Sequence, residues 1–150
     1  MVLTRRRFLV TAAGSGLALS ALPGEVARAT PETMAAAMRE VLGEAEPKKG
    51  RVKLEMPVMV ENGNVVPMTV SVDAPLDGEG RAVSLHVFAE LNPNPNVLNV
   101  TFGPRAGKPQ LATRIRLSTS QTVYAVAKLA DGSLWSDQIE LLVTLAACLE

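Results

Sequence analysis

Short segments in which apolar and polar residues alternate fill most of the chain after residue 50. A period of two places the apolar side chains on one face of a β-strand, whereas a helix needs a repeat near 3.6 residues. Turn signals such as Glu61-Asn62-Gly63-Asn64 and Asp131-Gly132 separate the segments. The pattern therefore predicts an all-β sandwich of about seven strands, at residues 52–56, 66–72, 83–89, 97–102, 112–117, 123–129 and 134–145.

The composition is that of a single soluble domain with an aliphatic core. Hydrophobic residues make up 47% of the sequence but aromatic residues only 3%. The length of 150 residues corresponds to one domain. The 15 basic residues equal the 15 acidic ones, and this balance gives no reason to expect nucleic-acid binding.

A short helix is expected before the first strand. Thr30 is a capping residue, Pro31 suits the first helical position, and Gly43 is a plausible end. Apolar residues follow at helical spacing and share one face. We expect this face to pack on the protein's own sandwich, and the alternative is that it holds a partner subunit. Its residues are Met34, Met38, Val41 and Leu42.

The first 29 residues have the features of a signal peptide. Three arginines at residues 5–7 precede Phe8-Leu9, a short apolar run follows, and Ala27-Arg28-Ala29 is a small-residue cleavage site. Adjacent arginines indicate the twin-arginine (Tat) export route. We therefore predict cleavage before Thr30 and a mature periplasmic domain of residues 30–150, with 11 basic and 14 acidic residues and no membrane anchor. A retained N-terminal anchor is the alternative.

Few residues in the sequence suggest catalysis. The single His and the single Cys lack the paired spacing of a metal site. The sequence contains no P-loop, no dinucleotide-binding fingerprint and no serine-nucleophile elbow. We therefore predict no catalytic residue, no metal and no cofactor. His86, in the middle of an expected strand, is interpreted as a hydrogen-bonded structural residue.

Cys148 lies shortly after the last expected strand. A residue in this position is usually exposed, whereas a core cysteine lies within a strand or helix among apolar neighbours. A lone cysteine can form no internal disulfide, so it indicates a reactive thiol or an intermolecular bond, including a homodimer linked through Cys148. The alternative is that Leu149 folds back and Cys148 is an inert apolar residue.

Several blocks of the sequence, in the same order, resemble the SoxY family, the sulfur carriers of the bacterial thiosulfate-oxidising system. The resemblance covers nearly all of the chain and includes the twin-arginine leader. The similar blocks are residues 61–67, 71–75, 86–90 with Asn92-Pro93, 113–117, 125–127, 131–133, and Val143-Thr144 before the cysteine.

The resemblance implies an immunoglobulin-like fold and a heterodimer with SoxZ, a second β-sandwich protein. It further implies that Cys148, which matches the family's cysteine by position, is the covalent attachment point for sulfur intermediates. A Sox cytochrome would couple thiosulfate to this cysteine, and a sulfate-releasing hydrolase and a sulfur dehydrogenase would process the adduct. The carrier itself would catalyse nothing.

The sequence departs from the family at the arm that carries the cysteine. Family members typically end Gly-Gly-Cys-Gly-Gly, whereas Ala146, Ala147, Leu149 and Glu150 flank Cys148 here. Alanine reaches fewer backbone conformations than glycine, so we expect a stiffer arm. The Glu150 carboxylate disfavours a nearby thiolate, by only about 1 kcal/mol in water.

Three interpretations of this ending compete. The protein is a working carrier with a divergent arm, or a paralogue whose carrier function has changed. A third interpretation is that Leu149-Glu150 is a cloning artefact, against which the intact leader argues. The rival to a carrier is a β-sandwich that binds a partner or scaffolds an assembly without carrying sulfur.

Overall fold

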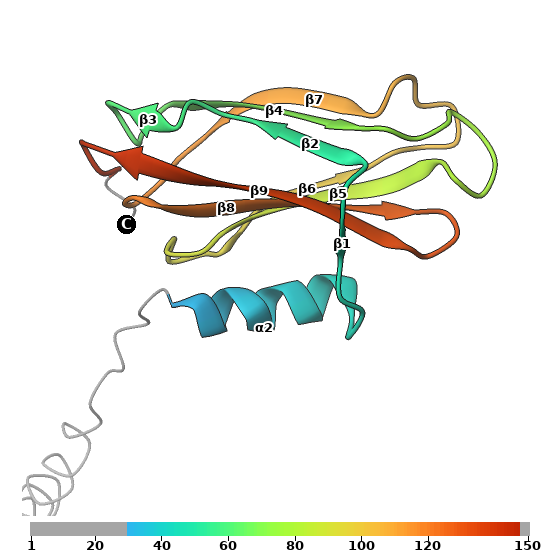
Figure 1. The fold of residues 1–150 in the computed structure, drawn as a ribbon, viewed down its shortest axis with the longest axis horizontal. Coiled ribbons are helices and arrows are strands. Elements are labelled where there is room, and N and C mark those ends of the chain that lie inside the picture. The colour runs from blue at the N-terminus through green and yellow to red at the C-terminus, as the bar shows by residue number, and fades with distance from the viewer. Residues whose placement is uncertain (1–29, 148–150) are drawn as a thin grey trace, which may run out of the picture.

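The computed structural model describes residues 30–147, and its two sheets pack face to face. The larger sheet has the order β1-β9-β8-β5-β6, with β3 also pairing with β9, and the smaller has the order β2-β4-β7. Figure 1 shows the two layers edge-on, with α2 beyond the larger sheet. The elements are α2 Pro31–Leu42, β1 Lys48–Lys49, β2 Val52–Glu55, β3 Met59–Val60, β4 Val66–Val72, β5 Ala82–Ala89, β6 Asn96–Thr101, β7 Gln110–Ile115, β8 Gln121–Leu129 and β9 Leu134–Val143.

The predicted all-β, immunoglobulin-like sandwich is confirmed, with each of the seven expected strands present. Two short strands, β1 and β3, were not expected. Each has only two residues, too few to show an alternation, and each is held by parallel pairing with β9. The expected strand 134–145 ends at Val143, and the expected strand 112–117 is shifted to Gln110–Ile115. The predicted signal peptide lies outside the described residues.

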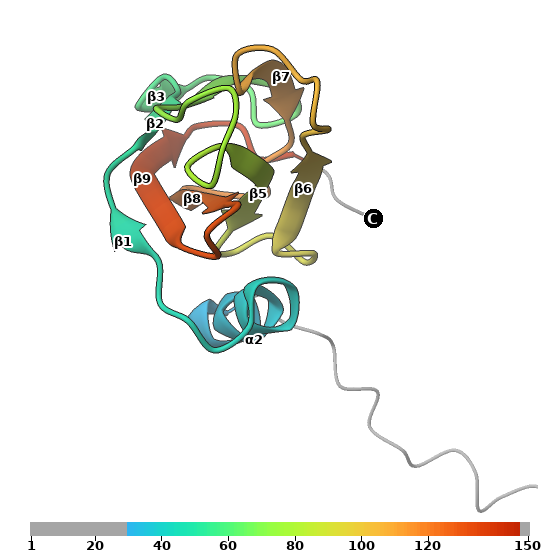
Figure 2. The same ribbon diagram turned by 90° about the vertical axis from the view of Figure 1, so that its right-hand side faces the viewer.

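The core between the sheets is aliphatic, as the composition predicts. Alternation places one set of β4 side chains, Val66, Met68 and Val70, against Leu85 and Val87 of β5, and all five are nearly or fully buried. Each such side chain stabilises the fold by about 1.5–3 kcal/mol relative to an exposed one. Figure 2 shows the sandwich end-on, with β6 and β7 at open edges of the two sheets.

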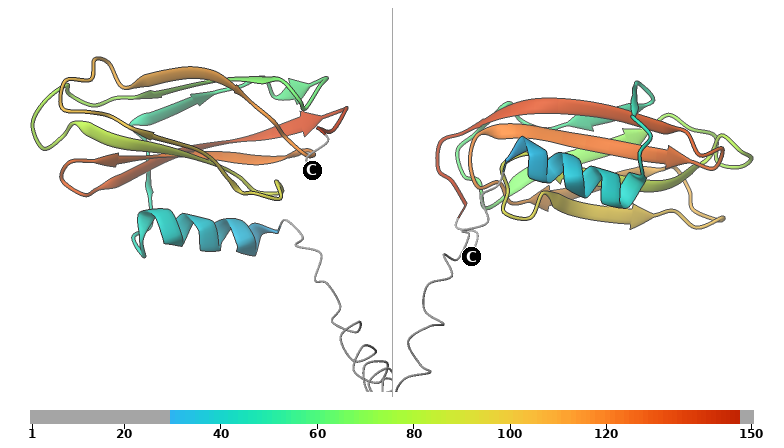
Figure 3. Two further views of the ribbon diagram at one scale, coloured as in Figure 1. Left: turned by 180° about the vertical axis from the view of Figure 1, so that it is seen from behind. Right: turned by 90° about the horizontal axis from the view of Figure 1, so that it is seen from below.

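The helix packs on the protein's own sandwich, which confirms the first of the two expectations for it. The opposite face of β5 presents Phe88, which forms a second cluster with Val126, Leu134 and Met34 of α2. Figure 3 shows α2 lying across the outer face of the larger sheet. The helix begins at the predicted cap, where the Thr33 N–H donates to Thr30 Oγ1 at 3.3 Å. Among residues 30–147, the structure contains no helix with the length and hydrophobicity that a membrane span requires.

Candidate functional site at the C-terminal end of β9

The end of β9 lies at the end of the sandwich where three connecting loops meet (Figure 1). These are the loop between β3 and β4, the loop between β5 and β6, and the connection from β7 to β8. Residues 144–147 follow β9 into this group of loops. The structure therefore brings three loops, far apart in the sequence, around the residues that precede Cys148.

On one side, residues 58–61 hold the C-terminal segment. The Leu142 N–H donates to the Val58 carbonyl at 2.8 Å, and the Thr144 N–H donates to the Val60 carbonyl at 2.9 Å. The Thr144 hydroxyl adds a hydrogen bond to the Glu61 carbonyl at 3.1 Å. Residues 58–61, which include the short strand β3, thus hydrogen-bond to β9 as far as Thr144, just beyond its last residue.

A side chain holds the segment on the other side. The Val143 N–H donates to Ser120 Oγ at 2.8 Å. Ser120 directly precedes β8. The N–H of the last residue of β9 therefore bonds to a side-chain hydroxyl instead of to a backbone carbonyl of a neighbouring strand. An unpaired buried amide is costly, and Ser120 removes that cost.

The hydrogen bonding continues beyond β9 as far as Ala147. The Gly63 N–H donates to the Leu145 carbonyl at 2.8 Å, and the Leu117 N–H donates to the Gly63 carbonyl at 2.8 Å. The Ala147 N–H donates to the Leu117 carbonyl at 3.0 Å. We call these three hydrogen bonds the anchor. Leu117 lies two residues beyond the end of β7, and both of its backbone groups belong to the anchor.

The structure describes two of the four predicted arm residues. Ala146 is exposed, whereas Ala147 is only 7% exposed and its amide is part of the anchor. Cys148, Leu149 and Glu150 lie outside the described residues. The segment is therefore fixed to the body of the sandwich up to the residue directly before the cysteine.

A buried polar network supports the Leu117 segment. Asn92 and Gln121 are 5% and 4% exposed. Asn92 Oδ1 accepts from the Ser118 N–H at 3.0 Å and from Gln121 Nε2 at 3.0 Å, while Asn92 Nδ2 donates to the Arg116 carbonyl at 2.9 Å. The Gln121 side chain also accepts from the Leu91 N–H at 2.7 Å. The network connects the β5–β6 loop to residues 116–118. This segment includes the Leu117 carbonyl, which accepts a hydrogen bond from the Ala147 N–H.

Exposed apolar side chains lie on the two segments that carry Gly63 and Leu145 of the anchor. Among residues 30–147, five of the seven large hydrophobic side chains that are exposed lie on segments that bond to one another here. Met59 is 65% exposed and Leu145 is 61% exposed. Exposed apolar groups that gather in one place commonly mark contact surfaces. We call this group the apolar rim: Val58, Met59, Val65, Leu142 and Leu145.

The His86 side chain is hydrogen-bonded, as predicted. Its Nδ1 lies 2.6 Å from Asn99 Oδ1 and its Nε2 lies 2.9 Å from Ser84 Oγ. In the part of the chain that the structure describes, no group of three or more His, Cys, Asp or Glu side chains is placed to hold a metal ion.

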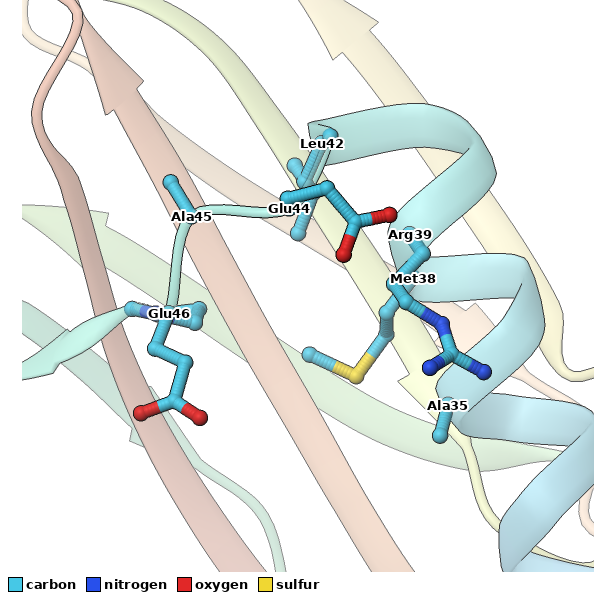
Figure 4. A pocket seen from close by; sticks show the side chains of 9 residues that line it. Ala35, Met38, Arg39, Leu42, Glu44, Ala45 and Glu46 are labelled. Atoms are coloured by element: carbon cyan, nitrogen blue, oxygen red, sulfur yellow. The ribbon is translucent and has the colours of Figure 1, made fainter.

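A groove of about 310 Å³ lies between the last turns of α2 and the loop to β1. Figure 4 shows the Met38 thioether reaching from the helix toward this loop. The charged side chains of its lining are Arg39, Glu44 and Glu46. The groove lies at the far end of α2 from the anchor (Figure 1), so it is separate from the segment before Cys148.

Sequence reasoning did not find the anchor or the polar network. Asn62-Gly63 belongs to a predicted turn, and Asn92 lies between two predicted strands. Their functions depend on contacts with residues 24 to 82 positions away, which no local pattern reports. The one available signal was that both positions lie in blocks that resemble the SoxY family.

Solved structures with similar folds include a sulfur carrier and superoxide reductases. The sulfur carrier protein SoxY from Chlorobium limicola f thiosulfatophilum is 23% identical with a TM-score of 0.63, covering 76% of this chain and 98% of that one. A variant of the superoxide reductase (neelaredoxin) from Ignicoccus hospitalis is 20% identical with a TM-score of 0.56, covering 76% and 92%. A putative superoxide reductase from Thermotoga maritima is 20% identical with a TM-score of 0.54, covering 65% and 87%. At these identities the likeness establishes the fold alone.

The family comparison is more specific than the fold. No curated protein sequence matches the chain significantly. The model of the family described as sulfur oxidation protein SoxY matches residues 38–148, which is most of the chain and includes the anchor, the polar network and the cysteine. This chain therefore belongs to the SoxY family of sulfur oxidation proteins.

Proposed function

We propose that the protein is a carrier that holds thiosulfate-derived sulfur covalently on Cys148 and presents it to the enzymes of a Sox system. The observation that carries this proposal is the family match, which extends to residue 148 and so includes the chain's single cysteine. The anchor supports it, because it fixes the chain to the sandwich up to Ala147, the residue directly before that cysteine.

The proposed chemistry needs a thiolate and an external oxidant. The Cys148 thiolate sulfur bonds to the outer sulfur of thiosulfate, and the two electrons released pass to a cytochrome. The product is a cysteine S-thiosulfonate. Water then attacks the sulfonate sulfur in a hydrolase, sulfate leaves with the release of two protons, and a cysteine persulfide remains. A sulfur dehydrogenase oxidises the remaining sulfur to a sulfonate with three water molecules, and the six protons and six electrons are released, the electrons to a cytochrome. A second hydrolysis then releases sulfate and restores the Cys148 thiolate, so the carrier itself only holds the intermediates.

The proposed partners are a SoxZ-like subunit, in a heterodimer, and the three enzymes of these steps. The apolar rim supports contact with protein partners, since it leaves Met59 and Leu145 mostly exposed next to the segment before Cys148. The proposed location is the periplasm, reached by the twin-arginine route after removal of residues 1–29. This location rests on the leader sequence and on the compartment of the proposed partners.

A genetic replacement tests the proposal. In the native host, the gene is replaced by a Cys148→Ser variant, and thiosulfate consumption and sulfate production are measured. Loss of both, with normal amounts of the variant protein, is the expected result. The rival function is a partner-binding or scaffolding sandwich, which is favoured by the Ala-Ala-Cys-Leu-Glu ending. It predicts that Cys148→Ser leaves thiosulfate oxidation intact.

A further inference from the structure

Gly63 has a close contact with the backbone of two other segments. A Cβ atom added at this position would lie 2.4 Å from the Leu117 carbonyl oxygen, 2.9 Å from the Ala147 nitrogen and 3.1 Å from the Leu145 carbonyl oxygen. A Cβ atom less than 3.0 Å from another atom forces one of the two to shift. Here the neighbouring atoms belong to the backbone, which shifts at a larger energetic cost than the end of a flexible side chain. Any residue other than glycine therefore pushes the three segments apart.

Space, and not backbone conformation, requires glycine here. The glycines with a positive φ among residues 30–147 are Gly43, Gly50, Gly78 and Gly132, and Gly63 is not one of them. Its own N–H and C=O supply two of the three hydrogen bonds of the anchor. The missing side chain thus permits the approach, and the backbone groups of the same residue hold it.

We propose that Gly63 is a positioning residue for Cys148. By allowing the anchor to close, it fixes Ala147, the residue to which Cys148 is covalently bonded, in place relative to the apolar rim. This inference rests on the proposed carrier function of Cys148.

The rate at which an enzyme loads sulfur onto Cys148 should depend on the anchor. An enzyme that docks on the body of the protein meets the thiol at a constant place only while the anchor is closed. A displacement of about 1 Å between reacting groups can lower a rate by on the order of 100-fold. A small reagent in solution needs no docking, so its reaction with the thiol does not depend on the anchor.

The test compares Gly63→Ala with Gly103→Ala. Gly103 has open space around its missing side chain and no positive φ, so its variant controls for the substitution itself. A second variant, Ala147→Pro, removes the amide hydrogen that Leu117 accepts and leaves Gly63 unchanged. If Gly63→Ala does not fold, Ala147→Pro tests whether the anchor positions Cys148.

Three measurements are made on each full-length variant. Amide hydrogen exchange reports on Ala147 and, as a core reference, on Val126. Iodoacetamide measures the intrinsic reactivity of the thiol. Intact mass spectrometry of protein from the native host, supplied with thiosulfate, follows the appearance of a reducible adduct on Cys148 with time.

For Gly63→Ala we expect exchange at Ala147 to become at least about tenfold faster while exchange at Val126 is unchanged. Adduct formation should fall about tenfold or more, while the reaction with iodoacetamide is unchanged or faster. Gly103→Ala should match the wild type in all three measurements. A variant that only destabilised the fold would also expose Val126.

The remaining outcomes overturn one proposal or both. If wild-type Cys148 carries an adduct and Gly63→Ala carries it at the same rate, the positioning role is wrong and the carrier function stands. The same holds if Ala147 keeps its protection in Gly63→Ala. If wild-type Cys148 never carries an adduct, the carrier function is wrong, and the positioning role with it. Ala147→Pro is judged by the same criteria.

Discussion

Replacing Asn92 with alanine should destabilise the protein through the polar network under the anchor. Asn92 is 5% exposed and makes hydrogen bonds to Arg116, Ser118 and Gln121. Gln121 Nε2 keeps a second acceptor at the Thr119 carbonyl, and the Ser118 hydroxyl keeps the Leu91 carbonyl. The groups that lose their hydrogen bond are the Ser118 N–H and the Arg116 carbonyl. At about 1–2 kcal/mol each, Asn92→Ala should lower the free energy of unfolding by about 2–4 kcal/mol.

Urea unfolding followed by circular dichroism measures this change. The midpoint should fall with an unchanged slope, since the surface exposed on unfolding stays the same. Asn94→Ala, an exposed position on the same loop, is the matched control and should change stability by less than about 0.5 kcal/mol. A loss below about 1 kcal/mol for Asn92→Ala would refute the reasoning, because the network would then be held by water or by relaxed geometry.

Three further predictions concern the helix, a hairpin and the rim. Phe88→Ala should cost about 3–5 kcal/mol, measured by urea unfolding, because Phe88 is fully buried under the helix; a cost below about 1 kcal/mol would contradict the packing. Hydrogen bonds from the Ser133 hydroxyl and amide hold the pKa of Asp131 below 3.8, so its contribution to stability is present above that pH and is lost as the pH falls through the lower folded-state pKa. An NMR titration should show this, and Ser133→Ala should raise the midpoint; a midpoint at or above 3.8 in the wild type would contradict the bonding. Leu145→Asp should leave stability within about 0.5 kcal/mol but slow adduct formation on Cys148 in the host, whereas the equally exposed Leu76→Asp should change neither; equal effects of the two would argue against the rim.

The strands could be predicted because their information is local. Along β4 the alternation of Val66, Met68 and Val70 with polar residues matches the observed pattern of buried and exposed side chains. The short strand β3 could not be predicted, since its two residues form a strand only because β9 lies beside them. Phe88 shows a related limit: it interrupts the alternation of β5, and the reason is the helix on the outer face of the sheet.

The sequence points to the cysteine of the proposed site but not to the geometry of the residues before it. The single cysteine and the family resemblance indicate Cys148, and the last strand is expected to end at residue 145. Backbone hydrogen bonds extend the fixed part to Ala147, and these depend on Gly63 and Leu117, which lie 84 and 30 residues earlier in the chain. Hydrogen bonds between backbone groups hardly restrict which amino acids occupy the positions that form them. The exception is the glycine that permits the close approach.

The central claim is that Cys148 carries sulfur, and intact mass spectrometry tests it most directly. The protein is isolated from its native host during growth on thiosulfate, and its mass is measured before and after reduction. We predict a mass increase of one thiosulfate unit, or of added sulfur atoms, that maps to Cys148 and disappears on reduction. A Cys148 thiol that stays unmodified in these cells, while the host oxidises thiosulfate, would contradict the account and favour a scaffolding role.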